Sequence, residues 1–238
     1  MGTRRKSLRL LSLALCLALC GLLSGAEKPE ADAFEPPADL DEGWYARIET
    51  SKGRVIARLL PEQAAQAVAH FAGLAQATLP WTNMITGEMM TTHYYDGMLV
   101  HTVVAGRLFE TGDAGSIGGV MPLLYVPEEG FGPIDFSRSY MMGMTRMGGG
   151  RISAVKFFVT AAGQPWLNGQ NPCFGQVVEG KEVVFNISQV RSYSNRRPIE
   201  DIFIEKIRVF KVGDPPPLPE PVPFKPTRKK LEMRSSDP

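Results

Sequence analysis

The sequence predicts a mainly β fold, a closed β-barrel accompanied by two helices. Many short segments alternate apolar and polar residues between glycine and proline turns, a pattern typical of barrels and sandwiches. Only two segments space their apolar residues as a helix does. The chain has 238 residues, 44% of them apolar, so it can bury one substantial core and we expect a single main domain.

The N-terminal residues 1–26 have the composition of a signal peptide. Basic residues at positions 4–9 precede an apolar run over 8–23, and the small residues Ser24, Gly25 and Ala26 form a cleavage site. We expect cleavage after Ala26 and export to a periplasmic or extracellular space. An uncleaved N-terminal anchor is the alternative. Lipidation at Cys20, the one route we expect to a membrane, is disfavoured because Leu19 is bulky for a lipidation box.

Composition excludes several classes of function. The 26 basic and 25 acidic residues are nearly balanced, which gives no electrostatic argument for a nucleic-acid partner. The histidines at 70, 93 and 101 lack metal-ligand spacing, so we expect neither a metal site nor a cofactor. Cys173 is the one cysteine beyond the signal peptide and cannot form an internal disulfide. We interpret it as a small buried hydrophobe, with a reactive thiol as the alternative.

Residues 27–43 are rich in proline and acidic residues and predict an extended linker. Order is expected from Trp44, where two alternating segments over 44–59 flank the turn Ser51-Lys52-Gly53 and predict a β-hairpin. Pro61 then suits the first position of a helix that we expect to run to about Ala77. Residues 79–93, interrupted by proline and glycine, predict a loop or a small hairpin.

The second half of the chain contains the other helix and the last strand. Apolar residues over 181–189 recur at helical spacing, and the alternation over 202–209 predicts a closing strand. The glycines between 112 and 119, like Gly148-Gly149-Gly150, lack the Gly-Lys-Ser/Thr of a phosphate-binding loop, so we assign both groups to turns.

Residues 214–238 are proline-rich and end in basic residues, which predicts an extended polyproline-type tail. We expect this tail to be solvated. Two alternatives are that it docks a partner and that it visits a proline-binding groove of its own chain.

Several motifs occur in a recognisable order. Tyr-Tyr-Asp-Gly at 94–97, a histidine followed by Thr-Val-Val at 101–104 and Gly-Asp at 112–113 come first. Lys-Phe-Phe-Val-Thr at 156–160, Trp-Leu-Asn-Gly at 166–169 and Phe-Gly-Gln-Val-Val-Glu-Gly at 174–180 follow. Each motif is weak alone, but the ordered set over residues 44–213 resembles the cyclophilins, the peptidyl-prolyl isomerases.

This resemblance implies a closed eight-stranded antiparallel barrel capped by two helices, and proline-containing polypeptides as partners of a monomer. It also implies an apolar pocket for the proline ring, with Phe158 as its floor and Phe174 behind or beside it. The other apolar residues that the resemblance places around the pocket are Leu108, Trp166 and Leu167. Thr145 belongs to a segment that is similar to the substrate-contacting Met-Ala-Asn of the family.

The polar residues of the implied site depart from the family pattern. Thr102 stands where the family has its catalytic arginine, although the preceding His101 matches. The other replacements at family site positions are Glu110, Arg146, Lys156 and Asn171. We hypothesise that Glu110 and Lys156 form an ion pair, and that Arg107, Arg146 or Arg151 replaces the missing guanidinium. A solvated surface role is the alternative for all three arginines.

Two functions follow from this pattern. The first is an exported peptidyl-prolyl cis-trans isomerase, which catalyses by holding the proline ring and stabilising the twisted amide, without a nucleophile or metal. The alternative is a proline-peptide-binding module or holdase with little or no turnover. Thr102 favours the alternative, because threonine carries no positive charge.

Overall fold

A computed structural model describes residues 34–119, 124–127, 129 and 132–222. The chain divides into two units, Met1–Asp39 and Leu40–Pro238. In the first unit only residues 34–39 are described, and they form neither helix nor strand. The predicted signal peptide with Cys20, residues 27–33 of the linker and the basic end of the tail therefore lie outside the described residues.

The second unit is mainly β with two α-helices, as predicted. Within the described residues, ten strands form one antiparallel sheet, with the path β5-β12-β1-β2-β11-β9-β10-β7-β6 and with β8 paired to β10. The strands of the path are β5 (Met98–Leu99), β12 (Phe203–Val212), β1 (Gly43–Thr50), β2 (Gly53–Leu59), β11 (Cys173–Glu179), β9 (Met141–Arg146), β10 (Ile152–Thr160), β7 (Leu108–Thr111) and β6 (Thr102–Val104), and β8 is Tyr125–Val126.

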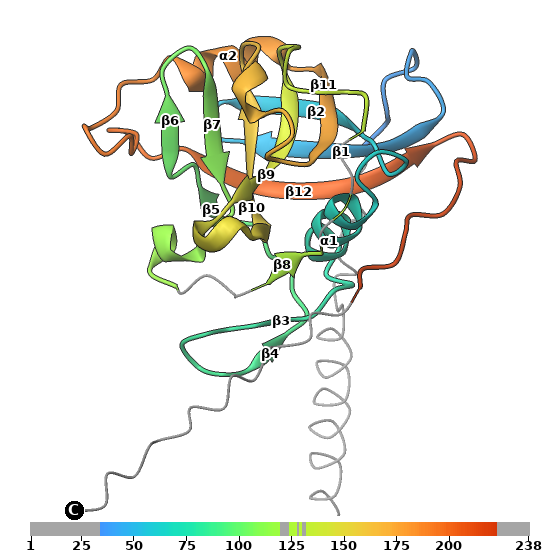
Figure 1. The fold of residues 1–238 in the computed structure, drawn as a ribbon, viewed down its shortest axis with the longest axis horizontal. Coiled ribbons are helices and arrows are strands. Elements are labelled where there is room, and N and C mark those ends of the chain that lie inside the picture. Colours follow the sequence, from blue (N-terminus) through green and yellow to red (C-terminus); the bar gives the residue numbers. More distant parts are fainter. Residues whose placement is uncertain (1–33, 120–123, 128, 130–131, 223–238) are drawn as a thin grey trace, which may run out of the picture. The chain divides into compact units, whose positions relative to one another are not determined.

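The sheet differs from the expected closed ring of eight strands. Its path contains nine strands, and the two ends of the path, β5 and β6, are consecutive in the chain. Figure 1 shows the sheet curled, with β1, β2 and β12 crossing the group of β6, β7, β9 and β10. The structure thus gives a curled nine-strand path whose ends come together through Val100 and His101.

The two helices cover different parts of the sheet. Helix α1 (Ala65–Ala75) packs on β10, β11 and β12, and α2 (Lys181–Ser188) packs on β2, β6 and β7. Figure 1 shows them at opposite ends of the curled sheet. Residues 79–93 form the small hairpin that was one of the two predicted forms, with β3 (Trp81–Thr82) paired to β4 (Met89–Met90).

The predicted start of the first helix is wrong. Pro61 lies in a turn rather than at the first helical position, because the carbonyl of Leu60 accepts the N–H groups of Gln63 and Ala64. The helix starts at Ala65, where the carboxylate of Glu129 accepts the N–H groups of Gln66 and Ala67 at 2.8 and 3.0 Å. A negative charge at this end also complements the helix dipole.

Two hydrophobic clusters fill the domain. The main core lies between α1, α2 and the sheet and includes Phe71, Phe157 and Phe174, all fully buried. A second, smaller cluster consists of Leu108, Phe136, Met141, Phe158, Leu167 and Cys173. Gly143 lies between Phe136 and Phe158, where a Cβ atom would overlap both ring tips. Only glycine therefore lets these two rings approach β9 so closely.

Candidate functional site

Strand β10 places two neighbouring phenylalanines in different clusters. Successive side chains of a strand point to opposite faces, so Phe157 enters the main core while Phe158 belongs to the second cluster. The ring of Phe158 packs against Phe136 with 5.3 Å between centroids, and only 4% of Phe158 is exposed. Leu108 of β7 and Leu167 complete an apolar floor.

A cavity of about 260 Å³ opens above this floor, and we call it the Phe158 pocket. Seven residues predicted for the site line it, and so does Arg107, one of the three arginines considered as a replacement for the missing guanidinium. The complete lining is Thr102, Val104, Arg107, Leu108, Glu110, Thr145, Phe158, Trp166, Leu167 and Arg196. Trp166 is 57% exposed and forms an edge of the pocket, while its indole N–H donates to Gln164 Oε1 at 3.0 Å.

Val104 and Arg196 line the pocket although the sequence did not predict them at the site, and Arg196 is the charged one. Arg196 lies in the exposed loop after α2 and has the left-handed backbone angle φ +68°, which is uncommon outside glycine. Its carbonyl accepts the N–H of Val103 at 2.8 Å, which fixes the loop against β6. Two arginines, Arg107 and Arg196, therefore line the pocket beside the uncharged Thr102.

A group of paired charges, which we call the polar wall, lies on one side of the pocket. Lys156 Nζ lies 3.5 Å from Glu110 Oε1 and 3.5 Å from Asp113 Oδ2. The hydroxyl of Thr145 donates to Glu110 Oε1 at 2.7 Å. The predicted ion pair between Glu110 and Lys156 is therefore confirmed, and both side chains are largely buried, at 16% and 14% exposed.

His101 lies beside the pocket and is not among its lining residues. Its Nδ1 is 3.0 Å from the hydroxyl oxygen of Thr102. Burial lowers the pKa of His101, and the carboxylate of Glu110 opposes this effect while Lys156 adds to it. The imidazole is therefore neutral at pH 7 and contacts the site through Thr102, which suits a supporting role.

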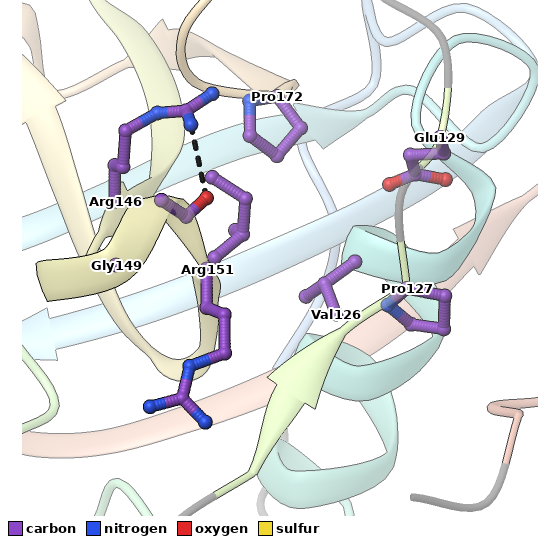
Figure 2. Close-up of a pocket in the computed structure, with 9 residues that line it drawn as sticks. Val126, Pro127, Glu129, Arg146, Gly149, Arg151 and Pro172 are labelled. Carbon is purple, nitrogen blue, oxygen red and sulfur yellow. Dashed lines mark hydrogen bonds between the residues drawn. The ribbon is translucent and has the colours of Figure 1, made fainter.

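A second cavity, of about 400 Å³, contains two of the arginines named above. Arg146 is held there by the carbonyls of Gln170 and Gly150, at 2.7 and 2.9 Å, and Figure 2 shows its bond to Gly150. Arg151 lies over the ring of Tyr125, 4.1 Å from the centroid. Neither arginine lines the Phe158 pocket, so neither is placed to replace the missing guanidinium.

This second cavity is larger than the Phe158 pocket but is less suited to binding a proline ring. Its walls are the two arginines, Glu129, the glycine turn and a few aliphatic or proline side chains, with no aromatic residue among them. We therefore place the candidate site at the Phe158 pocket.

Three other residues that the resemblance placed at the site lie outside the pocket. Asn171 is buried and donates to the carbonyl of Met144 at 2.8 Å, which is a structural contact. Phe174 belongs to the main core, where its ring centroid lies 5.1 Å from that of Phe71. Lys156 reaches the pocket only through Glu110.

Cys173 lies in the second cluster, beneath the pocket, as a buried residue. Burial raises the pKa of its thiol to about 12, which makes it an unreactive thiol and confirms its interpretation as a small hydrophobe.

The residues that the structure describes include no group of three or more His, Cys, Asp or Glu side chains able to hold a metal ion. No helix in the same residues is long and apolar enough to cross a membrane.

Comparisons with known proteins agree with this geometry. Residues 45–209 match the family model "Cyclophilin type peptidyl-prolyl cis-trans isomerase/CLD". The chain is 33% identical over 171 residues to peptidyl-prolyl cis-trans isomerase B of Streptomyces anulatus, covering 71% of this chain and 97% of the relative. It is 30% identical over 166 residues to peptidyl-prolyl cis-trans isomerase A of Mycobacterium tuberculosis, covering 69% and 91%.

Among solved structures, a cyclophilin-type isomerase of Cryptosporidium parvum, crystallised in the presence of the dipeptide Ala-Pro, shares the fold. The TM-score is 0.58 at 22% identity, and the match covers 70% of this chain and 98% of that one. The family model spans most of the curled sheet and both helices, from β1 to β12. The chain therefore belongs to the family of cyclophilin-type peptidyl-prolyl cis-trans isomerases.

Proposed function

We propose that this protein catalyses cis-trans isomerisation of peptide bonds that precede proline, with the proline ring seated in the Phe158 pocket. One observation carries the proposal: an apolar floor of Phe158, Leu108 and Leu167 lies beneath a cavity edged by polar groups and two arginines. An X-Pro bond isomerises over a barrier of roughly 18–20 kcal/mol because amide resonance must be broken. Holding the ring while the amide twists lowers this barrier without covalent chemistry.

A positively charged hydrogen-bond donor near the prolyl nitrogen would assist the reaction. The nitrogen of a twisted amide becomes pyramidal and accepts a hydrogen bond, so a donor near the prolyl nitrogen stabilises the transition state. Thr102 carries no charge and its hydroxyl already contacts His101. Arg196 and Arg107 are the charged donors that line the pocket, and we propose that Arg196 supplies the interaction because its loop is fixed to β6, the strand of Thr102.

The test is exchange NMR on an Ala-Pro peptide. We expect exchange broadening with the wild type and its loss in Phe158→Ala, with folding checked by circular dichroism. Arg196→Ala should slow exchange by about tenfold. This is less than the usual effect of removing a buried, preorganised donor, because water weakens the interaction of the exposed Arg196. Arg191→Ala is the matched control, an exposed arginine of the same loop outside the pocket. If Arg196→Ala and its control behave alike, Arg196 has no catalytic role.

The alternative is a binding module that holds prolyl peptides without turnover, and Thr102 is the observation that favours it. Such a module would bind the Ala-Pro peptide without accelerating exchange. Thr102→Arg would then produce exchange that the wild type lacks. Exchange catalysed by the wild type itself would exclude this alternative.

We also propose that the protein is exported by cleavage after Ala26, supported by the basic and apolar composition of residues 1–26. N-terminal sequencing of the protein recovered from its native source should begin at Glu27. A lipid on Cys20 would instead support the lipoprotein alternative, and an N-terminus that retains residues 1–26 would support an uncleaved anchor.

A further inference from the structure

The C-terminal tail is bound to the domain along residues 214–222, which we call the tail segment. It leaves β12 at Gly213, whose φ of +69° and closeness to Glu42 disfavour any residue with a side chain. The tail segment then runs past Trp44 to the start of α1 (Figure 1). The expectation of a solvated tail holds only in part for these residues, because none of them is buried but the domain binds their backbone. The tail segment also does not line the Phe158 pocket.

The side chains of Trp44 and Gln66 bind the backbone of the tail segment. The indole N–H of Trp44 donates to the carbonyl of Pro216 at 2.8 Å. The amide of Gln66 makes two bonds, since its Oε1 accepts the N–H of Val222 at 2.8 Å and its Nε2 donates to the carbonyl of Glu220 at 3.2 Å. The Gln66 amide thus recognises a carbonyl and the N–H two residues further on, a pair that an extended peptide presents on one side.

Apolar contacts accompany these bonds. Leu218 is partly buried against the main core. A cavity of about 500 Å³ remains between the tail segment and the domain, lined on the domain side by Trp44, Leu59 and Pro61 among others and on the tail side by Pro215, Pro216, Pro217 and Pro219. We call the face formed by Trp44, Pro61 and Gln66 the Trp44 groove.

The chemistry of the Trp44 groove fits proline-rich peptides. A polyproline-type chain has no internal hydrogen bonds, so its carbonyls are available to external donors. Aromatic-lined grooves bind such chains at low entropic cost because the chain is already extended. The bond from Val222 to Gln66 Oε1 adds a requirement, since the residue at that position must keep its N–H and cannot be proline.

We infer that the Trp44 groove is a second proline-recognition site whose ligand is an extended, proline-rich segment of a partner polypeptide, and that the tail segment occupies it in the free protein. The pattern of the bound segment, Pro-Pro-Pro-Leu-Pro-Glu-Pro-Val, defines the ligand class: prolines, an apolar residue at the place of Leu218, and a non-proline at the place of Val222. None of the groove residues lines the Phe158 pocket, so the site is separate from catalysis.

Because the tail segment is covalently joined to the domain, it competes with any partner segment for the Trp44 groove. A segment joined by a short linker has an effective concentration on the order of millimolar, so a partner segment must bind tightly or displace a weakened tail. A partner that occupied both the Trp44 groove and the Phe158 pocket would be held at two points. The inference thus goes beyond the isomerase function and does not depend on it.

The test uses the full chain with its tail released. In the double variant Leu218→Ser with Val222→Pro, the apolar contact and the N–H to Gln66 are both lost, whereas Val222→Ala keeps the N–H and is the matched control. The probe is the nonapeptide Asp-Pro-Pro-Pro-Leu-Pro-Glu-Pro-Val with a C-terminal amide. The indole NMR resonance of Trp44 reports the groove, and that of Trp166 reports the Phe158 pocket separately.

We expect release of the tail to move the Trp44 resonance and added peptide to return it saturably. The peptide should bind wild type and the control variant at least tenfold more weakly, because their own tail occupies the groove. Adding Trp44→Phe or Gln66→Ala to the released variant should weaken binding, and turnover of the Ala-Pro peptide should stay unchanged throughout.

Three results would overturn the inference. The first is a Trp44 resonance that does not move on release, and the second is a peptide that fails to bind the released variant or binds it no better than wild type. The third is concentration-dependent dimerisation of wild type with exchanged tails in sedimentation, which would make a second copy of the chain the occupant. Loss of isomerisation with the groove results intact would count against the proposed function alone.

Discussion

The ion pair between Glu110 and Lys156 should stabilise the folded protein measurably. The charged atoms lie 3.5 Å apart and both side chains are at least four-fifths buried. Coulomb's law at an effective dielectric constant of about 20 gives about 4–5 kcal/mol of gross attraction at this distance. Desolvation of two buried charges offsets most of it, so we expect a net coupling energy of about 1–2 kcal/mol.

A double-mutant cycle measures this coupling. Glu110→Gln, Lys156→Gln and the double variant keep side-chain size, and urea unfolding gives the free energy of each. Each single variant leaves one buried charge without its partner in the pair. We therefore expect the two single variants together to lose more free energy of unfolding than the double variant loses. Lys156→Gln also removes the ion pair with Asp113, but the single and the double variant lose it alike, so the cycle subtracts it.

The chain provides its own control for the cycle. Lys52 and Glu200 lie 3.8 Å apart but are 40% and 84% exposed, and solvent-exposed pairs contribute about 0–1 kcal/mol. The same cycle at this pair should give a coupling energy near zero. If the buried pair gives no more than the exposed pair, burial does not strengthen the polar wall and the reasoning fails.

Three further predictions concern the pocket floor and buried titratable groups. Gly143→Ala should cost about 1–3 kcal/mol in urea unfolding and slow Ala-Pro exchange, because its Cβ displaces the rings of the floor, whereas Gly148→Ala, in open space, should change little. Burial lowers the pKa of His70, so the unfolded state binds more protons below about pH 6.5; stability should fall from pH 7.5 to 5.5, by at most about 1.4 kcal/mol per pH unit from this residue, and less steeply in His70→Gln. Cys173 should resist thiol reagents at about pH 8 until urea unfolds the protein, and fast labelling of the native state would contradict its burial.

Local patterns predicted the elements whose partners are close in sequence. The alternation over 44–59 gave the hairpin of β1 and β2, and the spacing over 181–189 gave α2 almost to the residue. The start of α1 was mispredicted because its N–H groups are satisfied by Glu129, which is distant in sequence. A local rule places Pro61 at the first helical position, but a long-range carboxylate determines where the helix begins.

The residues of the site also fall into two groups, those that sequence motifs predict and those that long-range contacts bring to the pocket. Its apolar residues followed from ordered motifs, and the pair of Glu110 and Lys156 followed from two charge replacements at neighbouring positions. Of the two arginines that line the pocket, Arg107 was a candidate from the sequence, whereas Arg196 could not be predicted because a backbone hydrogen bond to β6 brings its loop there. The composition of residues 214–222 predicted an extended tail, but the bonds to Trp44 and Gln66 depend on side chains far from it in sequence.

The irregular pairing between β9 and β10 has a consequence for how this protein can vary. Between the pairs Ile152–Arg146 and Phe157–Met144, β10 carries more residues than β9, and the hydroxyl oxygen of Ser153 holds the excess by accepting the N–H groups of Val155 and Lys156. An inserted or deleted residue beyond this bulge would exchange Phe157 and Phe158 between the main core and the pocket. The bulge can absorb length changes from the glycine turn before they reach that pair. We therefore expect insertions and deletions among relatives to occur mainly in the glycine turn before Ser153, where they disturb neither folding nor substrate binding.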